Sequence, residues 1–273
     1  MKSAHPKKPS VAFVANATKP GAREAKRSLA AAAKKLGLAL APAAEADVIA
    51  VLGGDGTMLR AAHEFPGRPL LGLNLGGLGY LASVSGKAFD KALKMLARGR
   101  YSVSERTMLE VSNAGKTAVA LNEIAFRGGL SGHAAVLDVE SDGRAVTRYL
   151  ADGLLIATPT GSTAYSLAAG GPVLMPGVPA LVLTPLNPHA LAARPVVVGD
   201  EVRFTVTLRS RAGGDDAEPV GVYADGELVF EGMCDSPVEV KKSASSAKLV
   251  ELDGYDPYDV MSRKLGWTGS SVQ

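Results

Sequence analysis

An apolar run at residues 47–52 leads directly into Gly53-Gly54-Asp55-Gly56-Thr57, and a helix-like apolar segment, residues 58–65, follows. A short apolar run of this kind predicts a buried strand, so the glycines lie at a strand-to-helix turn. Glycine lets the backbone approach a ligand closely and adopt positive φ angles without a steric penalty. The N–H groups at the start of the helix favour an anion such as phosphate. The motif therefore predicts a phosphate-binding loop.

Asp55 is the unusual member of this loop. A carboxylate beside a phosphate is repelled unless it holds a metal ion or accepts a proton, so Asp55 indicates chemistry as well as binding. The alternative is a tight turn in which Asp55 is the N-cap of the helix. This motif alone leaves both interpretations open, because short glycine motifs often occur by chance.

Composition limits the classes of function. The chain has 273 residues, enough for two modest domains, and its net charge of +3 comes from dispersed basic residues, which predicts no nucleic-acid surface. A single cysteine, Cys234, excludes an intramolecular disulfide and a multi-cysteine zinc site. No apolar run is long enough for a membrane span, and residues 1–9 lack the apolar stretch of a signal peptide. We expect a soluble cytoplasmic protein that does not bind membranes.

Strand and helix patterns alternate through the first hundred residues, which predicts an open α/β sheet with crossover connections. Gly37 is expected to end the first helix. The expected strands are residues 10–15, 38–41, 47–52 and 69–74, and the expected helices are 22–36, 58–65 and 89–96.

After Gly99 the pattern changes to extended segments separated by turn residues, which predicts a β-rich second domain. We therefore expect domains at residues 1–100 and 101–250 and a tail at 251–273. The tail is expected to contain a short helix, 257–267, that packs Met261, Leu265 and Trp267 on a neighbouring element. The expected strands are 101–112, 117–127, 134–140, 145–149, 181–184, 201–208, 220–223, 228–230 and 238–240, with turns at 113–115, 128–129 and 142–143, a loop at 211–216 and a connector at 243–248.

The longest informative run is residues 152–166, Asp-Gly-Leu-Leu-Ile-Ala-Thr-Pro-Thr-Gly-Ser-Thr-Ala-Tyr-Ser. It predicts a strand ending near Thr158, a polar turn and a short helix at 162–168. Hydroxyl and N–H groups at a helix start can hold the polar edge of a ligand, and Tyr165 offers a stacking face for a base. The alternative is an ordinary strand–turn–helix capped by Ser and Thr. Four hydroxyls beside an Asp-Gly pair favour a ligand site.

Five segments together resemble the NAD kinase family. They occur in the family's order and span the chain from the first strand to about Leu249, which makes the resemblance specific. The segments are 53–57, Asn-Leu-Gly-Gly-Leu-Gly-Tyr-Leu at 74–81, Asn122-Glu123, 152–166, and Pro-His-Ala-Leu with Arg-Pro at 188–195.

The resemblance implies a Rossmann-like N-terminal α/β domain, a β-rich C-terminal domain and a tail that returns to the first. It also implies phosphorylation of NAD at the 2′-hydroxyl of its adenosine ribose, with ATP as donor and Mg²⁺ or another divalent cation required. NAD and ATP are the expected small-molecule partners. The expected assembly is a homodimer or homotetramer in which a neighbouring subunit completes each site.

The resemblance also implies residue roles. Asp55 is the base that accepts the 2′-hydroxyl proton, Asn122 binds the adenosine, and Glu123 positions a ribose or the metal. Asp152 meets the nicotinamide carboxamide, and the role of His189 stays open. The remaining expected ligand-binding residues are Gly53, Gly54, Gly56 and Thr57 for the phosphates, Asn74 and Tyr80 in the pocket wall, and Thr163, Ala164, Tyr165 and Ser166 around the adenine.

The sequence departs from the family at a few positions. Tyr80 replaces the usual Phe, Ala151 the usual Gly, and Gly77 a frequent basic residue, while neutral Leu150 stands where many members have Arg. Neutral Leu150 leaves the preference between NAD and NADH open. The choice between ATP and polyphosphate as donor also stays open. Three rival functions remain: a lipid kinase of the diacylglycerol or sphingosine type, a phosphofructokinase-like sugar kinase, and a catalytically silent NADP-binding sensor.

Overall fold

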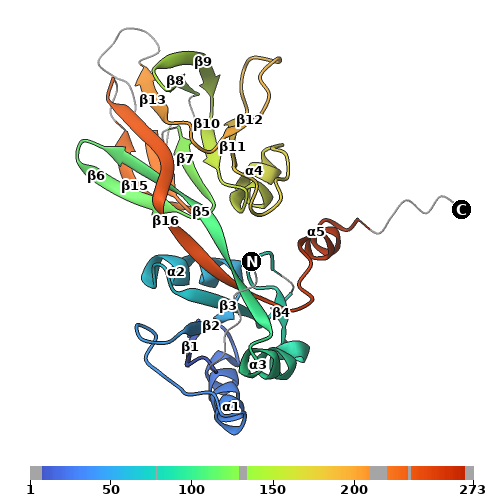
Figure 1. The fold of residues 1–273 in the computed structure, drawn as a ribbon. Coiled ribbons are helices and arrows are strands. Elements are labelled where there is room, and N and C mark those ends of the chain that lie inside the picture. The colour runs from blue at the N-terminus through green and yellow to red at the C-terminus, as the bar shows by residue number, and fades with distance from the viewer. Residues whose placement is uncertain (1–7, 78, 129–133, 210–219, 233–234, 268–273) are drawn as a thin grey trace, which may run out of the picture. The chain divides into compact units, whose positions relative to one another are not determined.

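The computed structural model describes residues 8–77, 79–128, 134–209, 220–232 and 235–267, which form two compact units (Figure 1). Unit 1 consists of residues 1–105 and 247–273, and unit 2 of residues 106–246. The expected loop at 211–216 and half of the expected turn at 128–129 lie outside the described residues. No helix in the described ranges has the length and apolar character needed to cross a membrane.

Unit 1 is built on a parallel sheet. Its strands are β1 (Val11–Ala15), β2 (Val48–Gly53), β3 (Pro69–Asn74) and the short β4 (Val84–Ser85). β2 lies between β1 and β3, and β3 also pairs with β4. The end of β16 (Pro237–Leu252) joins the sheet, because Lys248 and Leu249 pair in parallel with Pro69 and Leu70 of β3. Residues 38–41 are not a strand: only Leu40 forms a bridge, to Val11, and Pro42 then lacks the N–H that would extend it.

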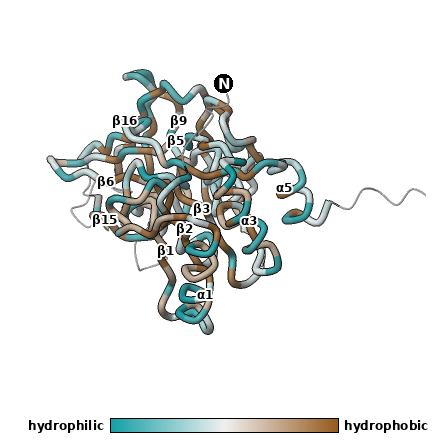
Figure 2. Tube along the Cα trace, turned by 60° about the horizontal axis from the view of Figure 1, so that its bottom comes forward, coloured by the Kyte–Doolittle hydropathy of each residue, from teal (hydrophilic) through white to brown (hydrophobic). Residues whose placement is uncertain are grey.

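Helices cover both faces of this sheet. α1 (Ala22–Lys35) and α3 (Phe89–Ala97, after the 3₁₀ turn η1, Gly86–Ala88) pack on one face, and α2 (Asp55–Glu64) packs on the other (Figure 1). Hydrophobic residues concentrate in β1–β3, while much of α1 is hydrophilic (Figure 2). Leu29 and Ala33 are its buried contacts with the core, so this amphipathic helix forms as the sequence predicts. Gly37 follows it with φ 74°.

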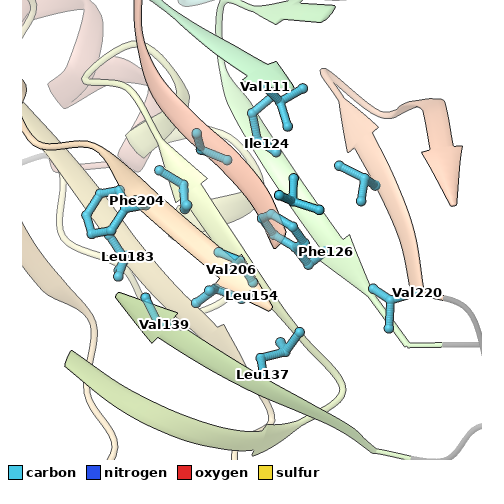
Figure 3. Packing of buried hydrophobic residues seen from close by; sticks show 14 of the residues in the cluster. Val111, Ile124, Phe126, Leu137, Val139, Leu154, Leu183, Phe204, Val206 and Val220 are labelled. Atoms are coloured by element: carbon cyan, nitrogen blue, oxygen red, sulfur yellow. The ribbon is translucent and has the colours of Figure 1, made fainter. Parts of the chain in front are cut away.

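Unit 2 is a sandwich of two sheets. The first is antiparallel, in the order β12-β11-β10-β7-β14-β15; the second contains β16-β13-β8-β9, with β5 paired to β16 and β6. Side chains from both sheets meet in one apolar core, where Phe126 and Leu154 face Phe204 and Val206 (Figure 3). The strands are β5 (Tyr101–Asn113), β6 (Lys116–Ala120), β7 (Glu123–Arg127), β8 (Ala135–Ser141), β9 (Arg144–Ala151), β10 (Gly153–Ala157), β11 (Ala180–Leu186), β12 (Val196–Gly199), β13 (Phe204–Arg209), β14 (Val220–Ala224) and β15 (Glu227–Gly232).

Three sequence predictions in unit 2 are corrected. The expected strand 117–127 is two strands, β6 and β7, because residues 121–122 between them have no strand conformation. The expected connector 243–248 lies inside the long strand β16. The expected helix 162–168 is a 3₁₀ turn, η2 (Gly161–Thr163), followed by a single-turn helix, α4 (Tyr165–Ala168), because Ala164 has a non-helical backbone.

The tail helix α5 (Pro257–Leu265) belongs to unit 1. Its N-cap is Asp256, whose carboxylate accepts a hydrogen bond from the N–H of Tyr258, and Gly266 ends it with φ 68°. The expected packing of Trp267 is wrong, since this side chain is 55% exposed. Val260 is instead the buried contact of the helix.

Candidate active site

The predicted phosphate loop is a strand-to-helix turn in unit 1. β2 ends at Gly53 and α2 begins at Asp55, with Gly54 as the N-cap and no side-chain cap. The alternative interpretation, in which Asp55 is the N-cap of the helix, is therefore wrong. Gly53 is needed because a Cβ atom there would overlap the side chain of Thr57, whereas Gly54 and Gly56 face open space. The first turn of the helix thus presents its N–H groups to an approaching anion.

The Asp55 carboxylate accepts hydrogen bonds from three consecutive backbone N–H groups. Oδ2 lies 2.9 Å from the nitrogen of Tyr80, and Oδ1 lies 3.0 Å and 2.9 Å from those of Leu81 and Ala82. An ionised carboxylate has about four acceptor positions, so about one remains, on Oδ2. The side chain is held in one orientation and keeps the capacity to accept a further hydrogen bond.

Asn74 holds the same loop from the end of β3. Its Nδ2 atom donates to the carbonyl of Ala82 at 3.2 Å, and its Oδ1 atom accepts from the N–H of Gly76 at 2.9 Å. The N–H of Gly79 also donates to the Ala82 carbonyl, at 3.1 Å. Asn74 is buried, so both ends of its amide are used inside unit 1. Its side-chain hydrogen bonds therefore fix the loop that follows β3.

Tyr80 lies beside this carboxylate. The Nζ atom of Lys264, in α5, lies 5.6 Å from the centre of its ring, which is a cation–π distance. The Tyr80 hydroxyl is buried and has no hydrogen-bond partner in the described part of the chain. Burial raises the pKa of this hydroxyl, and the nearby charge of Asp55 raises it further. Lys264 lies outside every sequence motif described above, so no local signal marks it as part of the site.

In unit 2, Asp225 forms a second cluster of the same kind. Its Oδ1 atom accepts from the N–H groups of Asn122 at 2.7 Å and Glu123 at 3.2 Å, and its Oδ2 atom accepts from that of Leu121 at 2.8 Å. Asp225 lies with Gly226 in the turn between β14 and β15, and both residues have positive φ angles. Taken alone, Asp225-Gly226 predicts a hairpin turn, and the pair is also similar to an Asp-Gly pair late in the family that the sequence resembles. An Asp-Gly pair signals the turn, but not the distant amides that its carboxylate binds.

Glu123 is a buried acid next to this cluster. Its side chain is only 7% exposed, and Oε2 has no hydrogen-bond partner among the described residues. Burial raises the pKa of this carboxyl to about 7, and the charge of Asp225 contributes in the same direction. A buried carboxyl oxygen without a partner is a position where a ligand donor or acceptor can bind.

The long signature run packs against Asn122. The Thr158 hydroxyl donates to the carbonyl of Leu121 at 2.6 Å, and the Thr158 N–H donates to that of Asn122 at 2.9 Å. Gly161 touches the Asn122 backbone so closely that a Cβ atom would overlap it. The structure therefore brings together two motifs that are separated in the sequence.

Most hydroxyls of this run bond within unit 2. Ser162 donates to the carbonyl of Pro159, Thr163 to that of Thr160, and Ser166 pairs with the hydroxyl of Thr184. These bonds form the turn that shapes the expected adenine pocket. Tyr165 differs, because it is 39% exposed and so presents part of its ring.

Asp152 lies at the opposite end of β10 from Thr158, so the structure does not bring it to the Asn122 cluster. Its Oδ2 atom accepts from the side-chain amide of Asn187 at 2.9 Å. The backbone N–H of His189 donates to the carbonyl of Leu150 nearby. Among the residues that the structure describes, no group of three or more His, Cys, Asp or Glu side chains is arranged to hold a metal ion.

Two family models match this chain. The model of the ATP-NAD kinase C-terminal domain matches residues 121–252, and that of the ATP-NAD kinase N-terminal domain matches residues 33–101. The chain belongs to the NAD kinase family. The NAD kinase of Symbiobacterium thermophilum is 41% identical over 232 residues, covering 82% of this chain and 80% of that protein. That of Geotalea daltonii is 38% identical over 230 residues, covering 82% and 79%.

Solved NAD kinase family structures share this fold. A yeast NADH kinase complexed with NADH superimposes with a TM-score of 0.82 at 26% identity, covering 98% of this chain and 90% of that one. An Archaeoglobus fulgidus NAD kinase in complex with ATP superimposes with a TM-score of 0.77 at 27% identity, covering 95% and 100%. The predicted combination of an α/β region with a β-rich region is confirmed.

Proposed function

We propose that this chain transfers the γ-phosphoryl group of ATP to the 2′-hydroxyl of the adenosine ribose of NAD, forming NADP and ADP. The observation that carries the proposal is the Asp55 carboxylate at the start of α2, held by the N–H groups of Tyr80, Leu81 and Ala82. The chain's membership of the NAD kinase family supports NAD as the acceptor, and the chain covers about four-fifths of the length of its NAD kinase relatives.

In this mechanism Asp55 is the proton acceptor. The ribose hydroxyl donates to the remaining acceptor position on Oδ2, its oxygen bonds to the γ-phosphorus, and the bond from that phosphorus to the β–γ bridging oxygen breaks. The proton passes to Asp55 and ADP leaves. A carboxylate is a weak base for an alcohol, but phosphoryl transfer has a loose transition state, so the proton leaves late.

The N–H groups at the start of α2 are proposed to hold phosphate oxygens. Gly54 and Gly56 leave open space around this turn, so phosphate oxygens can approach the peptide nitrogens. Donors fixed before the reaction stabilise charge that develops on the transferring group. The glycine loop would thus contribute to catalysis as well as to binding.

A divalent cation such as Mg²⁺ fits a site without a protein cage. Mg²⁺ usually keeps several waters and binds through one or two carboxylates together with substrate phosphates. The described residues offer no cluster of three acidic or imidazole ligands, so the phosphates of ATP are its proposed main ligands. When bound, the ion would neutralise charge on the phosphates.

The NAD-binding residues are proposed to come from unit 2. Asn122 would bind the adenosine and the Glu123 carboxyl the ribose, while Tyr165 would stack on the adenine. The exposed part of the Tyr165 ring and the unpartnered Oε2 atom of Glu123 support these roles. Asp152 lies at the far end of β10, which suits the expected contact with the nicotinamide carboxamide of an NAD molecule shared with a neighbouring subunit.

The decisive experiment measures NADP formation by the purified chain with NAD or NADH as acceptor and ATP or polyphosphate as donor. We expect NADP from NAD and ATP, and dependence on Mg²⁺ when a chelator is titrated in. Binding of NAD or NADP without turnover would favour the silent sensor, and phosphorylation of a diacylglycerol or a sphingoid base would favour the lipid kinase. Sedimentation of the same sample tests the proposed homodimer or homotetramer. The cytoplasm is its proposed location.

A further inference from the structure

Asp225 and Thr158 bond all six backbone polar groups of the segment Leu121–Asn122–Glu123. Its three N–H groups donate to the carboxylate of Asp225. Its carbonyls accept, in order, from the hydroxyl of Thr158, the N–H of Thr158 and the N–H of Asp225. Every backbone polar group of the segment therefore has a partner, although Leu121 and Asn122 lie outside any strand.

We propose that Asp225 is a positioning residue for NAD binding: its carboxylate fixes the backbone of residues 121–123, so that the side chains of Asn122 and Glu123 are presented to the ligand. The inference rests on the proposed function, in which those two side chains contact the adenosine part of NAD. Asp225 itself need not touch the substrate.

The geometry favours this role over that of a simple turn residue. Asp225 lies more than a hundred positions from the amides that it binds, so its side chain links two distant parts of the chain. Hydrogen bonds to an ionised acceptor are stronger than neutral ones, and three of them converge here. Without the carboxylate, three N–H groups beside a buried glutamate would lose their acceptor.

The chain supplies a matched control in Asp142. This residue also precedes a glycine in a hairpin turn of unit 2, between β8 and β9, and its φ of 49° equals that of Asp225. Its carboxylate, however, accepts from the N–H of Arg203, at 3.2 Å. A change at Asp142 therefore reports the effect of altering such a turn without touching residues 121–123.

The test compares Asp225→Ala, Asp225→Asn and Asp142→Ala with the wild type in full-length protein. Asparagine tolerates the positive φ and can keep the Oδ1 bonds to Asn122 and Glu123, but its NH₂ group cannot accept from Leu121. For Asp225→Ala we expect the KM and Kd for NAD to rise at least about tenfold, a loss of about 1.4 kcal/mol in binding, with the KM for ATP unchanged. Asp225→Asn should fall between Asp225→Ala and the wild type, and Asp142→Ala should match the wild type in both constants.

Hydrogen exchange provides a readout that does not depend on turnover. The amides of residues 121–123 should exchange faster than in the wild type in both Asp225 variants. In Asp142→Ala they should exchange at the wild-type rate. Wild-type affinity for NAD in Asp225→Asn, or in a folded Asp225→Ala, would overturn the inference, as would unchanged protection of these amides. Wild-type protein that forms no NADP would instead overturn the proposed function. If Asp225→Ala does not fold, Asp225→Asn decides.

Discussion

The backbone of Gly79 lies against the carboxylate of Asp55 so closely that a Cβ atom at position 79 would overlap Oδ1. We predict that Gly79→Ala displaces this carboxylate and lowers kcat by at least about tenfold, since a misplaced catalytic group can cost about a hundredfold in rate. The control is Gly77→Ala, because a Cβ atom there meets nothing within 4 Å. Comparable kcat values for the two variants would contradict the assignment of Asp55.

Asp55→Asn tests the proton acceptor directly. Its side-chain oxygen can still accept from two of the three amides, but the amide group cannot take the ribose proton. We expect kcat to fall by roughly 10²–10⁴-fold, the usual contribution of a general base, while calorimetry shows NAD still bound. Asp90→Asn, the same change at an exposed position of α3, should leave kcat unchanged. An Asp55→Asn enzyme with near-normal kcat would rule out the base.

Tyr165 tests the adenine pocket. Its ring is 39% exposed, so a base can stack on it without displacing core residues. Tyr165→Ala is expected to weaken NAD binding by about 1–3 kcal/mol, as for other aromatic side chains that stack on bases. Tyr165→Phe keeps the ring and should bind NAD with nearly wild-type affinity. Isothermal calorimetry decides, and equal affinities for the Ala and Phe variants would count against stacking.

Glu123 predicts a pH dependence of stability. Because burial raises the pKa of its carboxyl from 4.5 to about 7, the folded state favours the protonated form. Below pH 4.5 the carboxyl is protonated in both states and costs the folded state nothing. Above pH 7 it is charged in both states and destabilises the folded state fully, so the stability of the protein falls as the pH rises from 4.5 to 7. Glu123→Gln lacks the titration. As the pH rises from 4.5 to 7, the unfolding free energy of Glu123→Gln should therefore increase relative to that of the wild type, by up to about 3 kcal/mol.

Urea denaturation at pH 5 and pH 8 measures this difference. Glu140→Gln removes an acid from an exposed position on β8 and serves as the control. The prediction fails if Glu123→Gln and Glu140→Gln show the same change relative to the wild type between the two pH values.

Local patterns were enough to predict much of the fold. β3 has the predicted bounds, because an apolar run between polar residues allows few other structures, and α1 is defined by its amphipathic pattern and Gly37. The errors have physical causes. The Ser- and Ala-rich segment 243–248 resembles a linker, yet it continues β16 because Ser243 and Ala247 are small enough to be buried there.

The candidate site was predictable only where side-chain chemistry was visible in a motif. Asp55 and Asn122-Glu123 could be selected in this way. The bonds that hold them could not, because backbone N–H groups are the same at every residue. Which three of them meet Asp55 or Asp225 depends on the tertiary structure. Local pattern alone therefore predicts a turn at Asp225 and the end of a strand at Thr158, and it does not predict the backbone groups that these residues bind.

Unit 1 is built from two separate parts of the chain, and this has a consequence for biosynthesis. Unit 2 is one continuous stretch, whereas unit 1 waits for residues 247–273, including Lys248 and Leu249, which pair with β3. Because domains fold as units while the polypeptide emerges from the ribosome, the middle of the protein can be complete before its beginning. Until residues 248–249 have emerged, β3 of the nascent chain lacks its pairing with β16.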